Sequence, residues 1–123
     1  MSAAEERSYA AAKPDPELSR YATDKALADI QATVFWHQQD GTTMRGTVRH
    51  TPVVSALDTA SDRLRATVTD CADTADYNEI KSVDGSQVPH AGSRRHVVTS
   101  TAQRTKAGSW LIYTSTIERD RTC

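Results

Sequence analysis

The spacing of hydrophobic residues along the chain changes near residue 41. Before this point, residues 3–12 are rich in Ala, Glu and Arg, which are good helix formers. Leu27, Ile30 and Val34 then recur at the spacing of one helix face. Gly41 follows as a natural C-terminal stop for that helix. The N-terminal third of the chain is therefore predicted to be helical.

Turn-forming residues separate the two predicted helices. The segment Lys13-Pro14-Asp15-Pro16 ends the first helix, because each proline disfavours helical conformation in the residue before it. Asp15 is expected to cap a short helix from Glu17 to Tyr21. Thr23 is expected to cap the longer helix, with Asp24 in a first turn where a carboxylate suits the helix dipole.

Beyond Gly41 the apolar residues alternate with polar ones, as they do in half-buried β-strands. Leu64, Ala66 and Val68, for example, alternate with Arg and Thr, which predicts one apolar and one polar face. The predicted strands are residues 45–57, 64–72, 94–105 and 109–118.

Shorter features complete this half of the chain. Residues 77–83 are a further candidate strand that turns at Asp84-Gly85, residues 86–93 are predicted as a loop, and residues 105–109 as a hairpin loop. Helices followed by antiparallel strands predict the α+β class. We expect a single domain over residues 1–123, with helices at about 3–40 and the sheet at about 45–120.

The charge balance argues against several classes of protein. The 123 residues carry a net charge of −1, from 15 basic and 16 acidic side chains. This balance disfavours nucleic-acid binding by bulk electrostatics and a polybasic membrane anchor. No apolar run approaches the roughly 20 residues of a transmembrane helix. The first residues lack the pattern of a signal peptide, so we expect an exported form to have lost its signal or lipid-anchor segment, and any membrane link with it.

The chain has two cysteines, Cys71 in a predicted strand and Cys123 at the last position. A terminal thiol is well placed to tie down an end that would otherwise fray, and poorly placed for a metal ligand or nucleophile. We interpret the pair as a disulfide worth roughly 4 kcal/mol, which indicates an extracellular or cell-surface location. The alternative is a cytosolic protein with two free thiols.

Several short segments together resemble a known group of proteins. They are Ala66-Thr67-Val68-Thr69-Asp70-Cys71-Ala72-Asp73, Gly92-Ser93-Arg94-Arg95-His96, Gly108-Ser109-Trp110 and Thr122-Cys123, with Tyr21-Ala22-Thr23 and Thr43-Met44-Arg45-Gly46 upstream. Over about residues 15–123 the chain resembles secreted proteins and lipoproteins of actinobacteria that are related in fold to nuclear transport factor 2 and the polyketide cyclases.

The resemblance implies a cone-shaped domain, in which a curved antiparallel sheet wraps around helices and encloses a cavity, and in which the two cysteines pair. The chain departs from the group in its short first helix and in Tyr77, where members usually carry Trp. This fold hosts isomerases, cyclases, dehydratases and pure binding modules, so it does not by itself imply an activity.

Two residues are weak candidates for catalysis. Asp70 falls on the same strand face as Ala66 and Val68, where an ionised carboxylate must be paired or shifted in pKa. The simpler interpretation is that Asp70 caps a turn or pairs with Arg94 or Arg95. His96 lies on a predicted strand and is placed to line a cavity. No two His or Cys residues have a metal-binding spacing, so no metal or cofactor is expected.

Aromatic and basic residues are the candidates for ligand binding. Inward-facing aromatic side chains can line an apolar pocket, and an arginine can accept an anion. The candidates are Trp36, Tyr77, Arg95 and Tyr113. Trp110, which follows the hairpin loop, is predicted to lie in the core.

Three functions are consistent with these features. The first is an exported, non-enzymatic binding or interaction domain for a protein partner or a small apolar ligand, with a homodimer through the sheet as one form of association. The second is a small cavity enzyme of the isomerase or cyclase type, with Asp70 or His96 as general base. The third is a component of a secretion or conjugation assembly.

Overall fold

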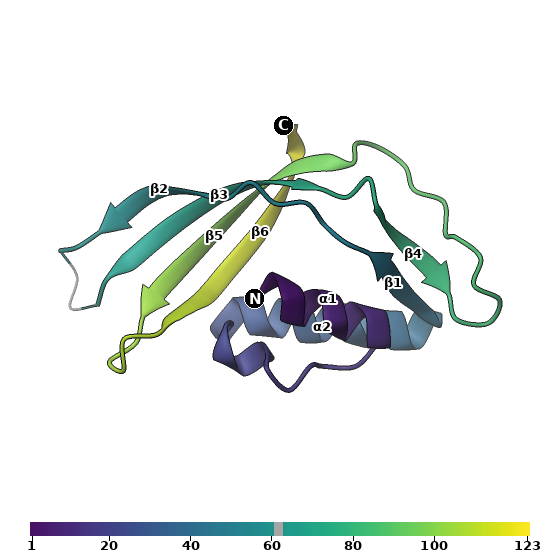
Figure 1. Cartoon of the computed structure of the whole chain (residues 1–123), viewed down its shortest axis with the longest axis horizontal. Coiled ribbons are helices and arrows are strands. Elements are labelled where there is room, and N and C mark those ends of the chain that lie inside the picture. The colour runs from purple at the N-terminus through teal and green to yellow at the C-terminus, as the bar shows by residue number, and fades with distance from the viewer. Residues whose placement is uncertain (61–62) are drawn as a thin grey trace.

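The computed structural model describes residues 1–60 and 63–123. Two helices lie side by side beneath two antiparallel sheets that slope away from each other (Figure 1). The α+β class is thus confirmed. In chain order the elements are α1 (Ser2–Ala11), the 3-10 turn η1 (Leu18–Arg20), α2 (Asp24–Asp40), β1 (Thr42–Gly46), β2 (Val53–Asp58), β3 (Arg65–Asp73), β4 (Tyr77–Lys81), β5 (Arg95–Arg104) and β6 (Trp110–Thr122).

The turn after α1 is held by polar side chains of the helix itself. The buried Ser8 hydroxyl donates to the Ala4 carbonyl and accepts from the Asp15 amide, at 2.8 and 2.9 Å. The expected short helix is a single 3-10 turn, and Asp15 does not cap it. Its carboxylate instead accepts from the Glu17 amide two residues on, at 2.9 Å, so it closes an Asx turn before η1.

Helix α2 follows the predicted hydrophobic spacing. Ile30 and Val34 are buried on its inner face, and Gly41 ends it with a left-handed φ of 67°. Thr23 occupies the N-cap position, but its side chain makes no capping hydrogen bond. The Thr23 amide donates to the Ile112 carbonyl at 2.9 Å, so the start of α2 is attached to β6.

The helices pack on each other through small side chains. Their buried cluster consists of Ala4, Leu18, Ala22, Ala26 and Ile30, and Ile112 of β6 packs against it. The prediction that Trp110 lies in the core is wrong, because this side chain is 43% exposed. Trp110 pairs with Arg104 next to the hairpin loop, and Ile112, two residues further on, makes the contact with the helices.

The strands form two sheets, where one was predicted. Four strands pair in the order β2-β3-β5-β6, and β1 pairs separately with β4. The prediction of one strand over residues 45–57 is therefore wrong. Gly46 ends β1 with a φ of 104°, and a Cβ atom there would lie 1.8 Å from the Asp76 carbonyl oxygen. The chain then crosses to the other sheet through residues 47–52.

The remaining sequence features agree with the structure at the level of elements. The hairpin loop between β5 and β6 closes with a hydrogen bond from the Thr105 amide to the Ser109 carbonyl, at 2.7 Å. β4 covers the first part of the candidate strand at 77–83. Within the predicted loop at 86–93, Gln87 forms an isolated bridge with Ile80.

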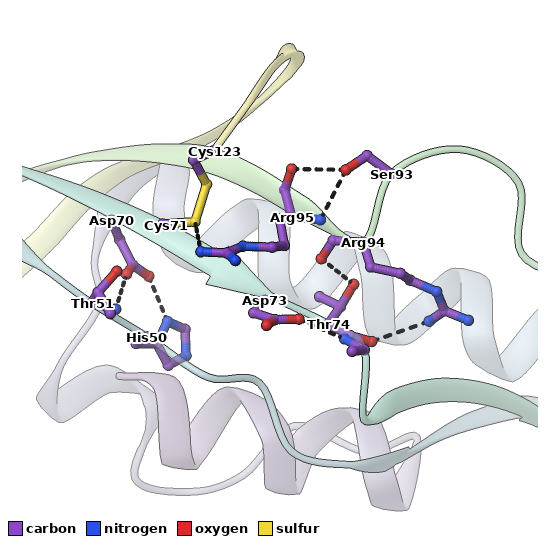
Figure 2. Close-up of a disulfide and its surroundings, with 11 residues drawn as sticks. His50, Thr51, Asp70, Cys71, Asp73, Thr74, Ser93, Arg94, Arg95 and Cys123 are labelled. Carbon is purple, nitrogen blue, oxygen red and sulfur yellow. Dashed lines mark hydrogen bonds and ion pairs between the residues drawn. A yellow bond between two sulfur atoms is a disulfide. The ribbon is translucent and has the colours of Figure 1, made fainter.

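Cys71 and Cys123 form a disulfide, as predicted, with their Cα atoms 6.0 Å apart. The bond joins the end of β3 to the residue that follows β6, on opposite sides of β5 (Figure 2). It therefore fastens the C-terminus across the four-stranded sheet. The described residues contain no free cysteine.

Candidate functional site

A cavity of about 550 Å³ lies between α1 and the face of the four-stranded sheet that is turned toward the helices. This volume falls within the range typical of small-molecule sites. Val68, Asp70 and Ala72 alternate on β3, so all three face the cavity, as the spacing predicts. The apolar part of the wall consists of Val48, Pro52, Val68, Ala72, Val98, Ile112 and Ile117.

Residues 47–52 form one side wall and are held from two directions. The Val48 amide donates to the Glu6 carboxylate of α1, at 3.0 Å. Arg49 and Asp73 exchange a pair of backbone hydrogen bonds, each 2.9 Å long. The segment thus bridges the first helix and the end of β3, although it belongs to neither sheet.

Asp70 and His50 form a close pair on this wall. The His50 Nδ1 atom lies 2.5 Å from one carboxylate oxygen of Asp70, and the Thr51 amide donates to the other oxygen at 2.6 Å (Figure 2). The Asp70 side chain is 11% exposed and that of His50 is 33% exposed. With Asp70 ionised, Nδ1 carries the proton and Nε2 is the nitrogen that remains free to accept one.

The two arginines that were considered as partners for Asp70 lie elsewhere. Arg94 donates to the Thr74 and Tyr77 carbonyls, both at 3.1 Å, and so clamps the turn that leads into β4. The Arg95 side chain is directed toward the disulfide, with Nη2 3.6 Å from the sulfur of Cys71 (Figure 2). Arg94 thus has a structural role in placing Tyr77.

Glu5 and Tyr9 line the cavity from α1. They are four residues apart on one face of α1, so their side chains are neighbours at the cavity, and Thr33 of α2 lines it beside them. Burial raises the pKa of Glu5, and the hydrogen bond from Tyr9 offsets part of this effect. Burial also raises the pKa of Tyr9, and the nearby charge of Glu5 adds to the increase.

Tyr77 lines the cavity from the start of β4. Its hydroxyl oxygen is inaccessible to solvent and has no hydrogen-bond partner among the residues that the structure describes. Burial raises the pKa of Tyr77, and the charges of Glu5 and Glu6 raise it further. The cavity therefore contains a polar atom whose hydrogen-bonding capacity the protein does not use.

Of the six residues proposed from the sequence for catalysis or ligand binding, Asp70 and Tyr77 line this cavity. Half-buried His96 pairs with Ala72 and Thr122 across the sheet and is not part of the cavity wall. Trp36 is 62% exposed. Tyr113 lines a separate hollow of about 260 Å³, between β2, β3, β5 and β6.

Three further residues of the cavity were not proposed from the sequence: Glu5, Tyr9 and His50. The four-residue spacing of Glu5 and Tyr9 is visible in the sequence, but nothing there says which helix face meets a cavity. His50 falls inside the stretch that the sequence predicts as one continuous strand.

The residues at 1–60 and 63–123 contain no group of three or more His, Cys, Asp or Glu side chains that could hold a metal ion. Within the same residues, no helix is long and apolar enough to cross a membrane. The polar side chains at the cavity include the half-buried carboxyl group of Glu5, the phenols of Tyr9 and Tyr77, the guanidinium of Arg119 and the imidazole of His50, which Asp70 holds.

Comparisons with known proteins support the fold alone. No family model matches the chain, and no curated protein matches it. Among solved structures, the intermembrane-space region of the chloroplast protein ARC6 is similar, with a TM-score of 0.59. The match covers 99% of this chain and 88% of the other, at 13% sequence identity.

Proposed function

We propose that this chain is an exported, non-enzymatic binding domain and that its cavity holds a small, mostly apolar ligand. The cavity carries this proposal, because it combines apolar walls with a few polar groups that point to one ligand-sized space. These groups include the Glu5 carboxylate and the imidazole of His50, which Asp70 holds at the cavity wall.

Two observations support a location outside the cytoplasm, at the cell surface or beyond. Disulfides persist in oxidising compartments and are rare where thiols are kept reduced, and this chain has one. The similar ARC6 structure comes from an intermembrane-space region. The resemblance to actinobacterial secreted proteins and lipoproteins implies one curved antiparallel sheet around helices that encloses a cavity. The chain has helices, antiparallel strands and a cavity, although its strands form two sheets, and we propose a cone-like domain of that group.

A protein partner, including a second copy of the chain, is a further part of this proposal. β2 is an edge strand of the four-stranded sheet, and its side chains are exposed along its whole length. Val53, Val54 and Leu57 are 63, 62 and 58% exposed. An apolar edge strand of this kind can pair with a strand of another chain.

A fluorescence titration tests the cavity. The neutral probe N-phenyl-1-naphthylamine should bind the oxidised protein saturably, with enhanced emission. Ala72→Trp, which fills the cavity from β3, should weaken binding at least tenfold. Thr69→Trp on the other face of the same strand is the matched control and should bind like the parent. Unsaturable binding to the parent, or equal weakening by both variants, contradicts the proposal.

One observation favours a catalytic alternative of the isomerase or cyclase type. Asp70 orients His50 at the cavity wall, which makes His50 the general base and Asp70 its positioning residue. This arrangement predicts that the oxidised protein exchanges the α-protons of a bound ketone such as cyclohexanone with deuterium, as followed by NMR. The exchange should be lost in His50→Gln and retained in His96→Gln. Absence of exchange in the parent contradicts the catalytic alternative.

A further inference from the structure

The three carboxylates that line the cavity differ in how completely the protein satisfies them. Glu6 accepts from the Val48 amide and the Thr47 hydroxyl. Asp70 accepts from His50 and the Thr51 amide. Glu5 lies beside Tyr9, four residues further along the same face of α1. Since an ionised carboxylate can accept about four hydrogen bonds, Glu5 retains the most unused acceptor capacity.

Glu5 also lacks a direct counter-charge. No Lys, Arg, His or chain terminus among residues 1–60 and 63–123 forms an ion pair with it. His50 and the amino group of Met1 lie near enough to favour its charge electrostatically. A half-buried carboxylate without an ion-pair partner is partly desolvated at a cost, and a cation brought by a ligand would offset that cost.

The neighbours of Glu5 are suited to a cation. Tyr9 and Tyr77 line the same cavity as Glu5, and Tyr9 lies about one helical turn from Glu5 on the same face of α1. Aromatic faces attract ammonium groups, and a phenol oxygen accepts a hydrogen bond from one. The hydroxyl oxygen of Tyr77, which is inaccessible to solvent, has no hydrogen-bond partner among the described residues.

We propose that the ligand of this cavity carries an ammonium group on an apolar body, and that Glu5 receives the ammonium between Tyr9 and Tyr77. This inference rests on the proposed function and adds the chemical class of the ligand. The ammonium group donates to the carboxylate of Glu5 beside the rings of Tyr9 and Tyr77, while the apolar body contacts the walls formed by β3, β5 and β6. A neutral head group forgoes the charge interaction, and an anionic head group meets three carboxylates and one guanidinium, that of Arg119.

Three probes with the same chain and different head groups test this inference: n-octylammonium, 1-octanol and octanoate. In calorimetric titrations of the oxidised protein at pH 7, n-octylammonium should bind at least tenfold tighter than 1-octanol, and octanoate should bind most weakly. Glu5→Gln should weaken the binding of n-octylammonium and so reduce its preference over 1-octanol to less than threefold.

Glu6→Gln is the matched control, because Glu6 lines the same cavity one residue away but is already hydrogen-bonded to residues 47 and 48. It should keep the preference, and an equal loss in both variants overturns the assignment to Glu5. In the parent protein, NMR should show contacts between the methylene group next to the nitrogen and the rings of Tyr9 and Tyr77. If this methylene group contacts other residues instead, the assignment to Glu5 is overturned, and this result does not depend on any variant.

The outcomes separate the inference from the proposed function. Equal binding of n-octylammonium and 1-octanol overturns the ammonium preference and leaves an apolar binding site. Failure of all three probes and of the neutral fluorescent probe to bind overturns both proposals.

Discussion

Two buried polar clusters lie where the helices meet the sheets, and they differ in completeness. In the first, the His37 Nδ1 atom and the Thr42 hydroxyl are 2.8 Å apart, and the same hydroxyl donates to Glu79 at 2.8 Å. His37 and Thr42 are 8 and 6% exposed. This cluster joins the end of α2 to β1 and β4, and its hydrogen bonds are made within the protein.

The second cluster consists of Glu5, Tyr9 and Tyr77 at the cavity. Tyr9 connects the two, because its ring packs on His37 with centroids 5.7 Å apart while its hydroxyl meets Glu5. Here hydrogen-bonding capacity remains unused at Glu5 and Tyr77. Burial of polar groups is therefore common to both clusters, and the unused capacity distinguishes the candidate site from the structural contact.

The largest expected effect comes from removal of the disulfide, which lies next to the cavity and not next to the His37 cluster. Cys71 is flanked by Asp70 and Ala72, which both line the cavity. Cys123→Ser should lower the free energy of unfolding by about 2–5 kcal/mol in urea titrations without reductant. Amide exchange should accelerate most at the ends of β3 and β6 and least in β1 and β4.

The control for this variant is the parent protein under strong reductant, which should unfold at the same urea concentration as reduced Cys123→Ser. Equal unfolding of the two oxidised samples would contradict the stabilising role. Equal acceleration of exchange in both sheets would contradict the link between the bond and the cavity.

A smaller effect is expected at the first cluster. Thr42→Val removes the hydroxyl that both His37 and Glu79 use, and it leaves these groups without their shared partner. The free energy of unfolding should fall by about 1–3 kcal/mol, the usual cost of an unsatisfied buried polar group. Binding of the neutral fluorescent probe should not change, because none of these three residues lines the cavity.

Thr43→Val, at the next position of β1, is the control for the loss of stability in Thr42→Val. Thr43 is half-buried and has no side-chain hydrogen bond with the described residues, so its replacement should change stability by less than about 0.5 kcal/mol. If Thr42→Val weakened probe binding as strongly as Ala72→Trp, the division into a structural and a functional cluster would be wrong.

The periodicity of the sequence predicts most of the elements but not how the strands are shared between sheets. The helix that carries Leu27, Ile30 and Val34 could be predicted, because the apolar face of a helix follows from the spacing of nearby residues. The break at Gly46 depends on the close approach of Asp76, which is thirty positions away in the chain and leaves no mark in a local pattern. For the same reason the pairing of β1 with β4 could not be predicted.

For the candidate site, as for the fold, the sequence predicts the local features but not the contacts between distant segments. Strand alternation places Asp70 on the inner face, as the structure does, and the cysteine positions predict the disulfide. The partner of Asp70 is His50, which no motif or spacing in the sequence distinguishes from the other three histidines. Glu5 and Tyr9 required knowledge of which face of α1 the cavity meets, and that depends on packing between distant segments.

The smallest expected effect is a difference in the pH dependence of stability between Glu5→Gln and the parent. Burial raises the pKa of Glu5 in the folded state above its value of 4.5 in the unfolded chain, so folding favours the protonated form. The stabilising contribution of that form is complete below pH 4.5 and is lost as the pH rises through the raised pKa. The parent therefore carries a cost at pH 7 that glutamine, which does not ionise, avoids.

Thermal unfolding at a series of pH values measures this effect. Glu5→Gln should melt at a higher temperature than the parent at pH 7, and the difference should shrink toward pH 4, because all other titrating groups are common to both proteins. Glu6→Gln removes a carboxylate that is hydrogen-bonded to Val48 and Thr47, so this variant should not melt at a higher temperature than the parent at pH 7. A pH-independent difference for Glu5→Gln would show that Glu5 is satisfied within the protein, like the His37 cluster, and would remove the distinction on which the ammonium site depends.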